Sequence, residues 1–139
     1  MSTSARRQPT VPQPQVYSPQ ELGEAALRGF FMLADAWSLN TAEQITLLGG
    51  PSRSTFFAWK KAPAVVISGD TMERISYLLG IWKALRILIP DDRQALAWIK
   101  KPNLHPMFGG NPPLERMLRG RLLDLADVRR MLDGRRGAW

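Results

Sequence analysis

The side chains best suited to catalysis or metal binding are scarce in this sequence of 139 residues. It contains no cysteine, so it has no thiolate nucleophile, disulfide or thiolate metal site. The single histidine, His105, stands beside a proline and has no carboxylates at metal-binding spacing. Asp91 and Asp92 are better placed to begin a helix than to act as an acid-base pair, because carboxylates complement the helix dipole there. The sequence therefore predicts no enzyme activity, no metal site and no cofactor.

Short polar and basic side chains cluster in residues 52–61 and favour another chemistry. Hydroxyl groups and a guanidinium can bond to base edges and phosphates, whereas lysine ammonium groups suit phosphates. The net charge of +7 and the pI near 10.6 also favour a polyanionic partner such as nucleic acid. We expect operator DNA to be contacted by Thr41, Ser52, Arg53, Ser54, Thr55, Lys60 and Lys61.

Three predicted helices would position these side chains. The first begins at residues 18–21, where serine is followed by proline and glutamate, and ends near residues 37–40. The second begins with a similar capping pattern at Thr41 and ends at the glycines of residues 49–50, and the third covers residues 52–61. Two short helices joined by a glycine turn after a longer helix are typical of a helix-turn-helix. The alternative is a generic three-helix core whose polar face is only solvated.

A long apolar helix is predicted over residues 70–89, from a capping pattern at Asp70 to a stop at Pro90. Its apolar residues spread over more than one face, so it needs neighbours on several sides. We therefore predict that it joins two halves of an all-α protein, although it could equally form part of a homodimer interface. Shorter helices are expected after Asp91, one of them through Lys100, and the last helix is expected to stop at Gly134.

The chain is predicted to divide into three parts. Residues 1–17 are rich in proline and polar residues and are expected to form a flexible tail. Residues 18–67 form the predicted helix-turn-helix region, and residues 68–139 form a C-terminal helical region that shares the long helix. The sequence lacks an apolar leader, and its most hydrophobic stretch, residues 77–89, is short and contains two cations. We therefore expect a cytoplasmic protein with no membrane partner.

Several short motifs follow one another in the C-terminal half. Alanine and tryptophan at 97–98 are followed by proline and asparagine at 102–103, and then by a Pro-Pro-Leu helix start at 112–114. With these motifs, residues 74–139 resemble the toxin-binding domain of the Xre/MbcA/ParS antitoxin family, in which an Xre-like DNA-binding part precedes that domain. One departure is the Leu-Arg-Gly-Arg segment at 118–121, where many relatives have a threonine and an acidic-glycine turn.

This resemblance implies a function and a partner. The partner would be a RES-domain toxin, from a family that depletes cellular NAD, and the C-terminal end of the antitoxin would plug the entrance to its active site. The resemblance also implies a homodimer that represses its own operon and assembles with the toxin. Two cations and an indole suit such a plug. The predicted toxin-binding residues are Arg135, Arg136, Gly137, Ala138 and Trp139.

Other interpretations stay open at this point. Composition alone favours a frayed terminus over a plug for the last five residues. The chain could also be a helix-turn-helix transcriptional repressor whose C-terminal region only dimerises and has no toxin partner. A third possibility is an inhibitor that binds a protein and has lost DNA binding. A pull-down against the product of the adjacent gene and an operator gel shift separate these functions.

Overall fold

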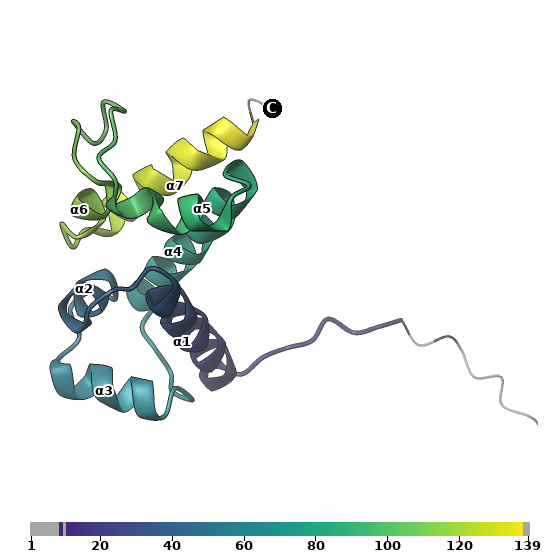
Figure 1. Ribbon diagram of the computed structural model, residues 1–139. Coiled ribbons are helices and arrows are strands. Elements are labelled where there is room, and N and C mark those ends of the chain that lie inside the picture. Colours follow the sequence, from purple (N-terminus) through teal and green to yellow (C-terminus); the bar gives the residue numbers. More distant parts are fainter. Residues whose placement is uncertain (1–8, 10, 138–139) are drawn as a thin grey trace, which may run out of the picture.

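The computed structural model describes residue 9 and residues 11–137, except for the side chains of residues 136 and 137. The described chain contains helices and no strand, which confirms the all-α prediction. Figure 1 shows the helices in two groups that meet along α4. The elements are α1 (Pro19–Ala36), α2 (Thr41–Leu47), α3 (Arg53–Lys61), α4 (Gly69–Leu88), α5 (Asp92–Ala97), the 3-10 helix η1 (Trp98–Lys100), α6 (Pro113–Met117) and α7 (Leu122–Gly137).

Reciprocal caps begin the first two helices. At α1, Ser18 Oγ accepts a bond from the Glu21 amide at 3.1 Å and the Glu21 carboxylate accepts one from the Ser18 amide at 3.2 Å, as predicted. At α2 the cap is Asn40 and not Thr41, so the predicted start is wrong by one residue. Asparagine is at least as good a cap as threonine. With Asn40 as the cap, Glu43 is the third residue of the helix, and its carboxylate accepts a bond from the Asn40 amide. Thr41 is the first helical residue.

α4 is the long helix that the sequence predicted, and it has 20 residues. Its cap is Ser68 rather than Asp70, because the Ser68 hydroxyl accepts a bond from the Thr71 amide at 3.1 Å. Asp70 lies in the first turn, where its negative charge complements the helix dipole. Its carboxylate accepts a hydrogen bond from Arg74 Nε at 2.8 Å. The helix ends at Leu88, with Ile89 as its C-cap just before Pro90, as predicted. Neither α4 nor any other described helix has the apolar length needed to span a bilayer.

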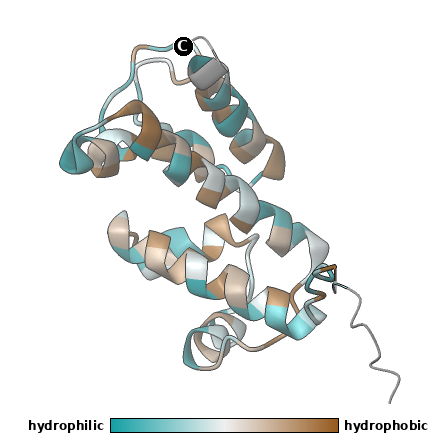
Figure 2. Cartoon of the chain, turned by 90° about the vertical axis from the view of Figure 1, so that its right-hand side faces the viewer, coloured by the Kyte–Doolittle hydropathy of each residue, from teal (hydrophilic) through white to brown (hydrophobic). Residues whose placement is uncertain are grey.

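One continuous hydrophobic core joins the two groups of helices. α1 and α7 both pack against α4 (Figure 1), so the long helix has neighbours on more than one side, as predicted. The core extends from Leu27 and Phe30 in α1, through Leu78 in α4, to Leu125 and Val128 in α7. Hydrophobic and hydrophilic residues alternate around the helices in Figure 2, which is expected where a helix buries part of its surface.

Two helix ends in the C-terminal group differ from the prediction. The helix expected to run to Lys100 ends at Ala97 and tightens into η1. α7 runs to Gly137, so the predicted stop at Gly134 is wrong. Gly134 is not among the residues with positive φ, and a glycine ends a helix by adopting the left-handed conformation. The backbone of α7 therefore continues through this position.

Candidate nucleic-acid and protein interfaces

The turn between α2 and α3 produces a helix-turn-helix arrangement. Gly49 and Gly50 have φ angles of +96° and +82°, which residues with a Cβ rarely adopt. Their amides donate hydrogen bonds to carbonyls in the last turns of α2 at 3.1 and 2.9 Å, so α2 ends in a fixed turn. Phe56 of α3 is fully buried, and its ring centre lies 5.9 Å from that of Phe31 in α1. This contact fixes one face of α3 on the core and leaves the opposite face exposed.

Four of the predicted DNA contacts lie together at the start of α3. Ser52 is the cap of the helix, and its hydroxyl oxygen lies 2.9 Å from Thr55 Oγ1 and 3.2 Å from Ser54 Oγ. Arg53 is exposed, and its guanidinium lies 5.5 Å from the centre of the Phe57 ring, within the range of a cation–π contact. One guanidinium and a group of hydroxyls therefore share the first turn of this helix.

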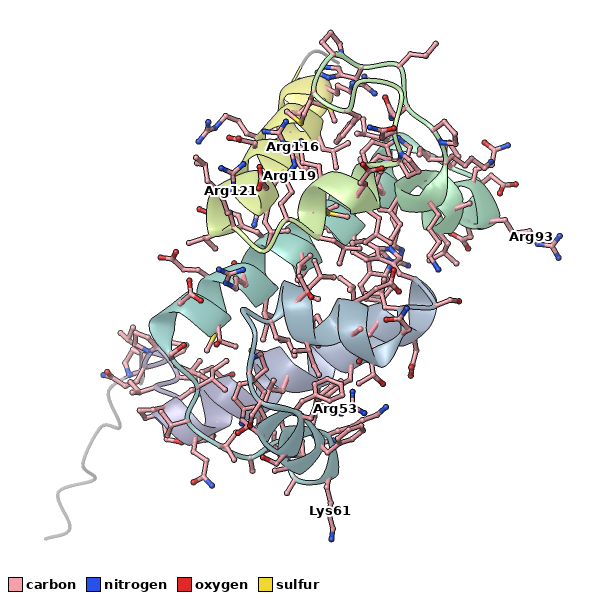
Figure 3. All side chains as sticks on the ribbon, turned by 90° about the vertical axis from the view of Figure 1, so that its left-hand side faces the viewer. Arg53, Lys61, Arg93, Arg116, Arg119 and Arg121 are labelled. Atoms are coloured by element: carbon pink, nitrogen blue, oxygen red, sulfur yellow. The ribbon has the colours of Figure 1, made fainter. Side chains whose placement is uncertain are left out.

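The remaining predicted DNA contacts are farther away. Lys60 and Lys61 are exposed in the last turn of α3, about 10 Å along the axis from its first turn. Figure 3 shows Lys61 extending from the end of α3, with Arg53 on the same helix. Thr41 is half-buried in the first turn of α2, which is a separate element. The structure thus brings together residues 52–55, with the two lysines at the other end of the same helix.

Sequence reasoning missed two side chains near these contacts. Phe57 is 44% exposed and lies under the Arg53 guanidinium, and its four-residue spacing from Arg53 was a usable signal. Arg28 of α1, which pairs with Glu24 at 2.8 Å, lines a shallow cleft together with Lys60 and its neighbouring lysine. No local pattern could place Arg28 there, because the cleft depends on how α1 and α3 cross.

Two arginines attach the start of α7 to the preceding chain. Arg116 of α6 lies 3.3 Å from Asp124 and 3.2 Å from Asp127, and Arg121 lies 3.0 Å from Asp124. The Asp124 side chain is only 2% exposed and that of Arg116 is 21% exposed, so solvent screens this pair weakly, whereas Arg121 is 64% exposed. In the segment that departs from the family pattern, Gly120 makes a turn with a φ of +83°. α7 therefore begins from a fixed position.

The predicted toxin-binding residues lie at and beyond the end of α7. Arg135 is exposed in its last turn, and the backbone of Arg136 and Gly137 completes the helix. Ala138 and Trp139 lie outside the described residues. Figure 1 places the described end of α7 and the α3 helix at opposite ends of the molecule.

His105 has a structural position in the loop before α6. Its Nδ1 accepts a hydrogen bond from the Met107 amide at 3.1 Å, and its ring centre lies 6.0 Å from that of Phe108. Within the part of the chain that the structure describes, no three potential ligands gather at metal-binding distance. The hydrogen bond and the ring contact give His105 a structural role in this loop.

Comparisons with known proteins match both halves of the chain. Residues 20–80 match the antitoxin Xre-like helix-turn-helix domain, and residues 84–137 match the antitoxin Xre/MbcA/ParS C-terminal toxin-binding domain. The uncharacterized protein y4oB of Sinorhizobium fredii is 50% identical over 113 residues, which cover 81% of this chain and 85% of the relative. The two matched regions meet within α4, the helix that carries the common core. The chain belongs to the Xre/MbcA/ParS antitoxin family and combines a DNA-binding helix-turn-helix with a toxin-binding domain.

Proposed function

We propose that this antitoxin neutralises a RES-domain toxin by placing its C-terminal end in the entrance of the active site where the toxin consumes NAD. The observation that carries the proposal is the attachment of α7, which Arg116 and Asp124 fix at its start. A helix fixed at its start holds its described end in a set position relative to the rest of the domain, and the C-terminal end continues from there. Residues 135–139 supply two cations and an indole, groups that are enriched at the centres of interfaces.

We infer that α3 binds the operator of the antitoxin's own operon. The exposed Arg53 and the hydroxyls beside it suit base edges, and Lys60 and Lys61 suit phosphates. Operators read by helix-turn-helix proteins usually have two half-sites, which a homodimer matches by its two-fold symmetry. The proposed assembly is therefore a homodimer within a larger cytoplasmic complex of antitoxin, toxin and DNA.

Co-expression tests the neutralisation step. Cells that produce the RES-domain toxin are expected to grow and to retain NAD when the full chain is present, and to lose both when residues 135–139 are deleted. The deletion is expected to leave operator binding in a gel shift unchanged, because α3 lies at the other end of the molecule. If the truncated chain fully restored growth and NAD, the proposal that the C-terminal end blocks the entrance would be wrong. Failure of the full chain to bind the toxin in a pull-down would contradict the assignment of the toxin and favour a plain repressor.

A further inference from the structure

A loop in the toxin-binding domain carries the most exposed large apolar side chain among the described residues. Leu104 is 93% exposed and lies in the loop of residues 101–112, between η1 and α6. Val66, in the loop before α4, is 68% exposed. Single exposed apolar residues are common on protein surfaces, so exposure alone does not indicate a contact. The structure of the loop around Leu104 is what distinguishes it.

Hydrogen bonds close this loop on itself. The Asn103 amide donates to the Asn111 carbonyl at 3.2 Å, and the Gly110 amide donates to the Asn103 carbonyl at 3.0 Å, so the two ends of the loop are paired. Within the loop, Asn103 Oδ1 accepts a bond from the His105 amide at 2.9 Å. Leu104 therefore stands between two residues whose backbones are held in place.

The loop is also attached to the rest of the domain. Phe108 is buried, and its ring centre lies 5.8 Å from that of Trp98. Arg116 Nη1 donates a hydrogen bond to the Met107 carbonyl at 3.0 Å, and Nη2 donates one to the Asp127 carboxylate of α7 at 3.2 Å. One guanidinium thus connects the loop to α7, and we expect the two to keep a constant relative position.

The position and charge of the loop indicate what kind of surface it fits. The loop and the described end of α7 lie at the same end of the molecule, away from α3 (Figures 1 and 2). The loop of residues 101–112 contains Lys101, which is exposed, and no carboxylate. A complementary partner would present an apolar pocket with acidic groups at its rim.

We propose that Leu104 is a second anchor for the toxin, inserted into an apolar, acid-rimmed pocket outside the entrance that the C-terminal end blocks. This inference rests on the proposed function, because it takes the same toxin as the partner. A side chain on a closed loop loses little conformational entropy when it binds, so more of the free energy of its burial appears as affinity. Burying an exposed leucine side chain in an apolar pocket removes its apolar surface from water, which favours association.

The test measures the dissociation constant between the full-length chain and a RES-domain toxin made inactive by substitution, using the toxin encoded beside this antitoxin. Leu104→Asp is expected to raise the dissociation constant about tenfold or more, and Leu104→Ala is expected to raise it less. Val66→Asp is the matched control, because it makes a similar change in an exposed loop of the other domain. The control is expected to bind the toxin normally, and all three variants are expected to keep the melting temperature and operator affinity of the unaltered chain.

The results separate this inference from the proposed function. If the unaltered chain binds the toxin and Leu104→Asp binds it equally well, the anchor is overturned and the proposed function stands. If the unaltered chain does not bind the toxin, both are overturned. If Leu104→Asp changes only self-association on gel filtration, the side chain belongs to a contact between two copies of the chain and the inference is overturned. Lys101→Glu is expected to slow toxin association at low salt more than at high salt, as an acidic rim requires.

Discussion

Arg74 and Gly120 join the two domains of this antitoxin: Arg74 Nη1 donates a hydrogen bond to the Gly120 carbonyl at 2.9 Å, while Nε binds Asp70 at 2.8 Å. The Arg74 side chain is only 11% exposed. A Cβ at Gly49, in the turn before α3, would lie 2.9 Å from Arg74 Nε. One guanidinium therefore lies beside the helix-turn-helix turn and binds the turn that precedes α7.

Replacing Arg74 with methionine is expected to lower the free energy of unfolding by about 1–2 kcal/mol, because a shielded charge-assisted hydrogen bond is lost while the packing of the stem is kept. Urea denaturation followed by circular dichroism measures the change. Arg28→Met is the control, since Arg28 forms an i,i+4 pair with Glu24 and is 64% exposed. Its loss is expected to stay below about 0.5 kcal/mol. Equal losses in the two variants would show that the contact with Gly120 contributes nothing.

Replacing Arg53 with alanine is expected to weaken operator binding by about 1–3 kcal/mol and to relax the preference at one base pair, because the guanidinium suits a guanine edge. Lys60→Ala is the comparison. It is expected to weaken binding to all DNA sequences alike. It should also lower the slope of log affinity against log salt concentration by about one, as loss of a phosphate contact does. Gel shifts at two salt concentrations on operator variants measure both. Unchanged affinity and sequence preference in Arg53→Ala would rule out base reading by this side chain.

Two glycines in helices are expected to respond in opposite directions to alanine. A Cβ at Gly23 of α1 would collide with the Val65 carbonyl oxygen, and backbone cannot move aside as a side chain can. Gly23→Ala is therefore expected to lower the free energy of unfolding by about 1–3 kcal/mol. Gly134 has open space around it within α7, so alanine there is expected to raise stability by up to about 1 kcal/mol. Thermal unfolding of both variants measures the difference, and no gain at Gly134 would indicate that α7 frays before this residue.

Replacing Asp124 with alanine is expected to destabilise the protein by about 3 kcal/mol, because it leaves Arg116 in a shielded position without this carboxylate. Arg130→Ala is the control, since Arg130 is 78% exposed and lies 3.7 Å from Asp127. Its effect is expected to be below about 0.5 kcal/mol. Urea denaturation measures both free energies. A similar small loss in the two variants would mean that the ion pairs of Asp124 do not hold the start of α7.

Helix boundaries were largely predictable because capping and stopping are local. Ser18 with Glu21 started α1 as predicted, and Pro90 marked the end of α4. The errors arose where local choices compete: Asn40 and Thr41 can both cap, and the position of Glu43 decides between them. The glycine in α7 was misleading because a glycine can remain helical when the chain continues.

Contacts between distant segments could not be predicted. Arg74 and Gly120 are far apart in the sequence, and their contact depends on how α7 packs on α4. The cluster of residues 52–55 could be predicted because these residues are consecutive in the sequence, and its use in DNA binding stays a prediction. The C-terminal plug also stays a prediction, since Ala138 and Trp139 lie outside the described residues.

The continuity of α4 limits how antitoxins of this kind can be recombined. Inserting one residue near Gly80 would rotate everything that follows by about 100° and shift it by about 1.5 Å relative to α1. A toxin specificity from another antitoxin can therefore be grafted here only if the phase of the helix is preserved. New pairings with toxins or operators are then expected to arise by changes in the surface residues at either end, more readily than by shuffling whole domains.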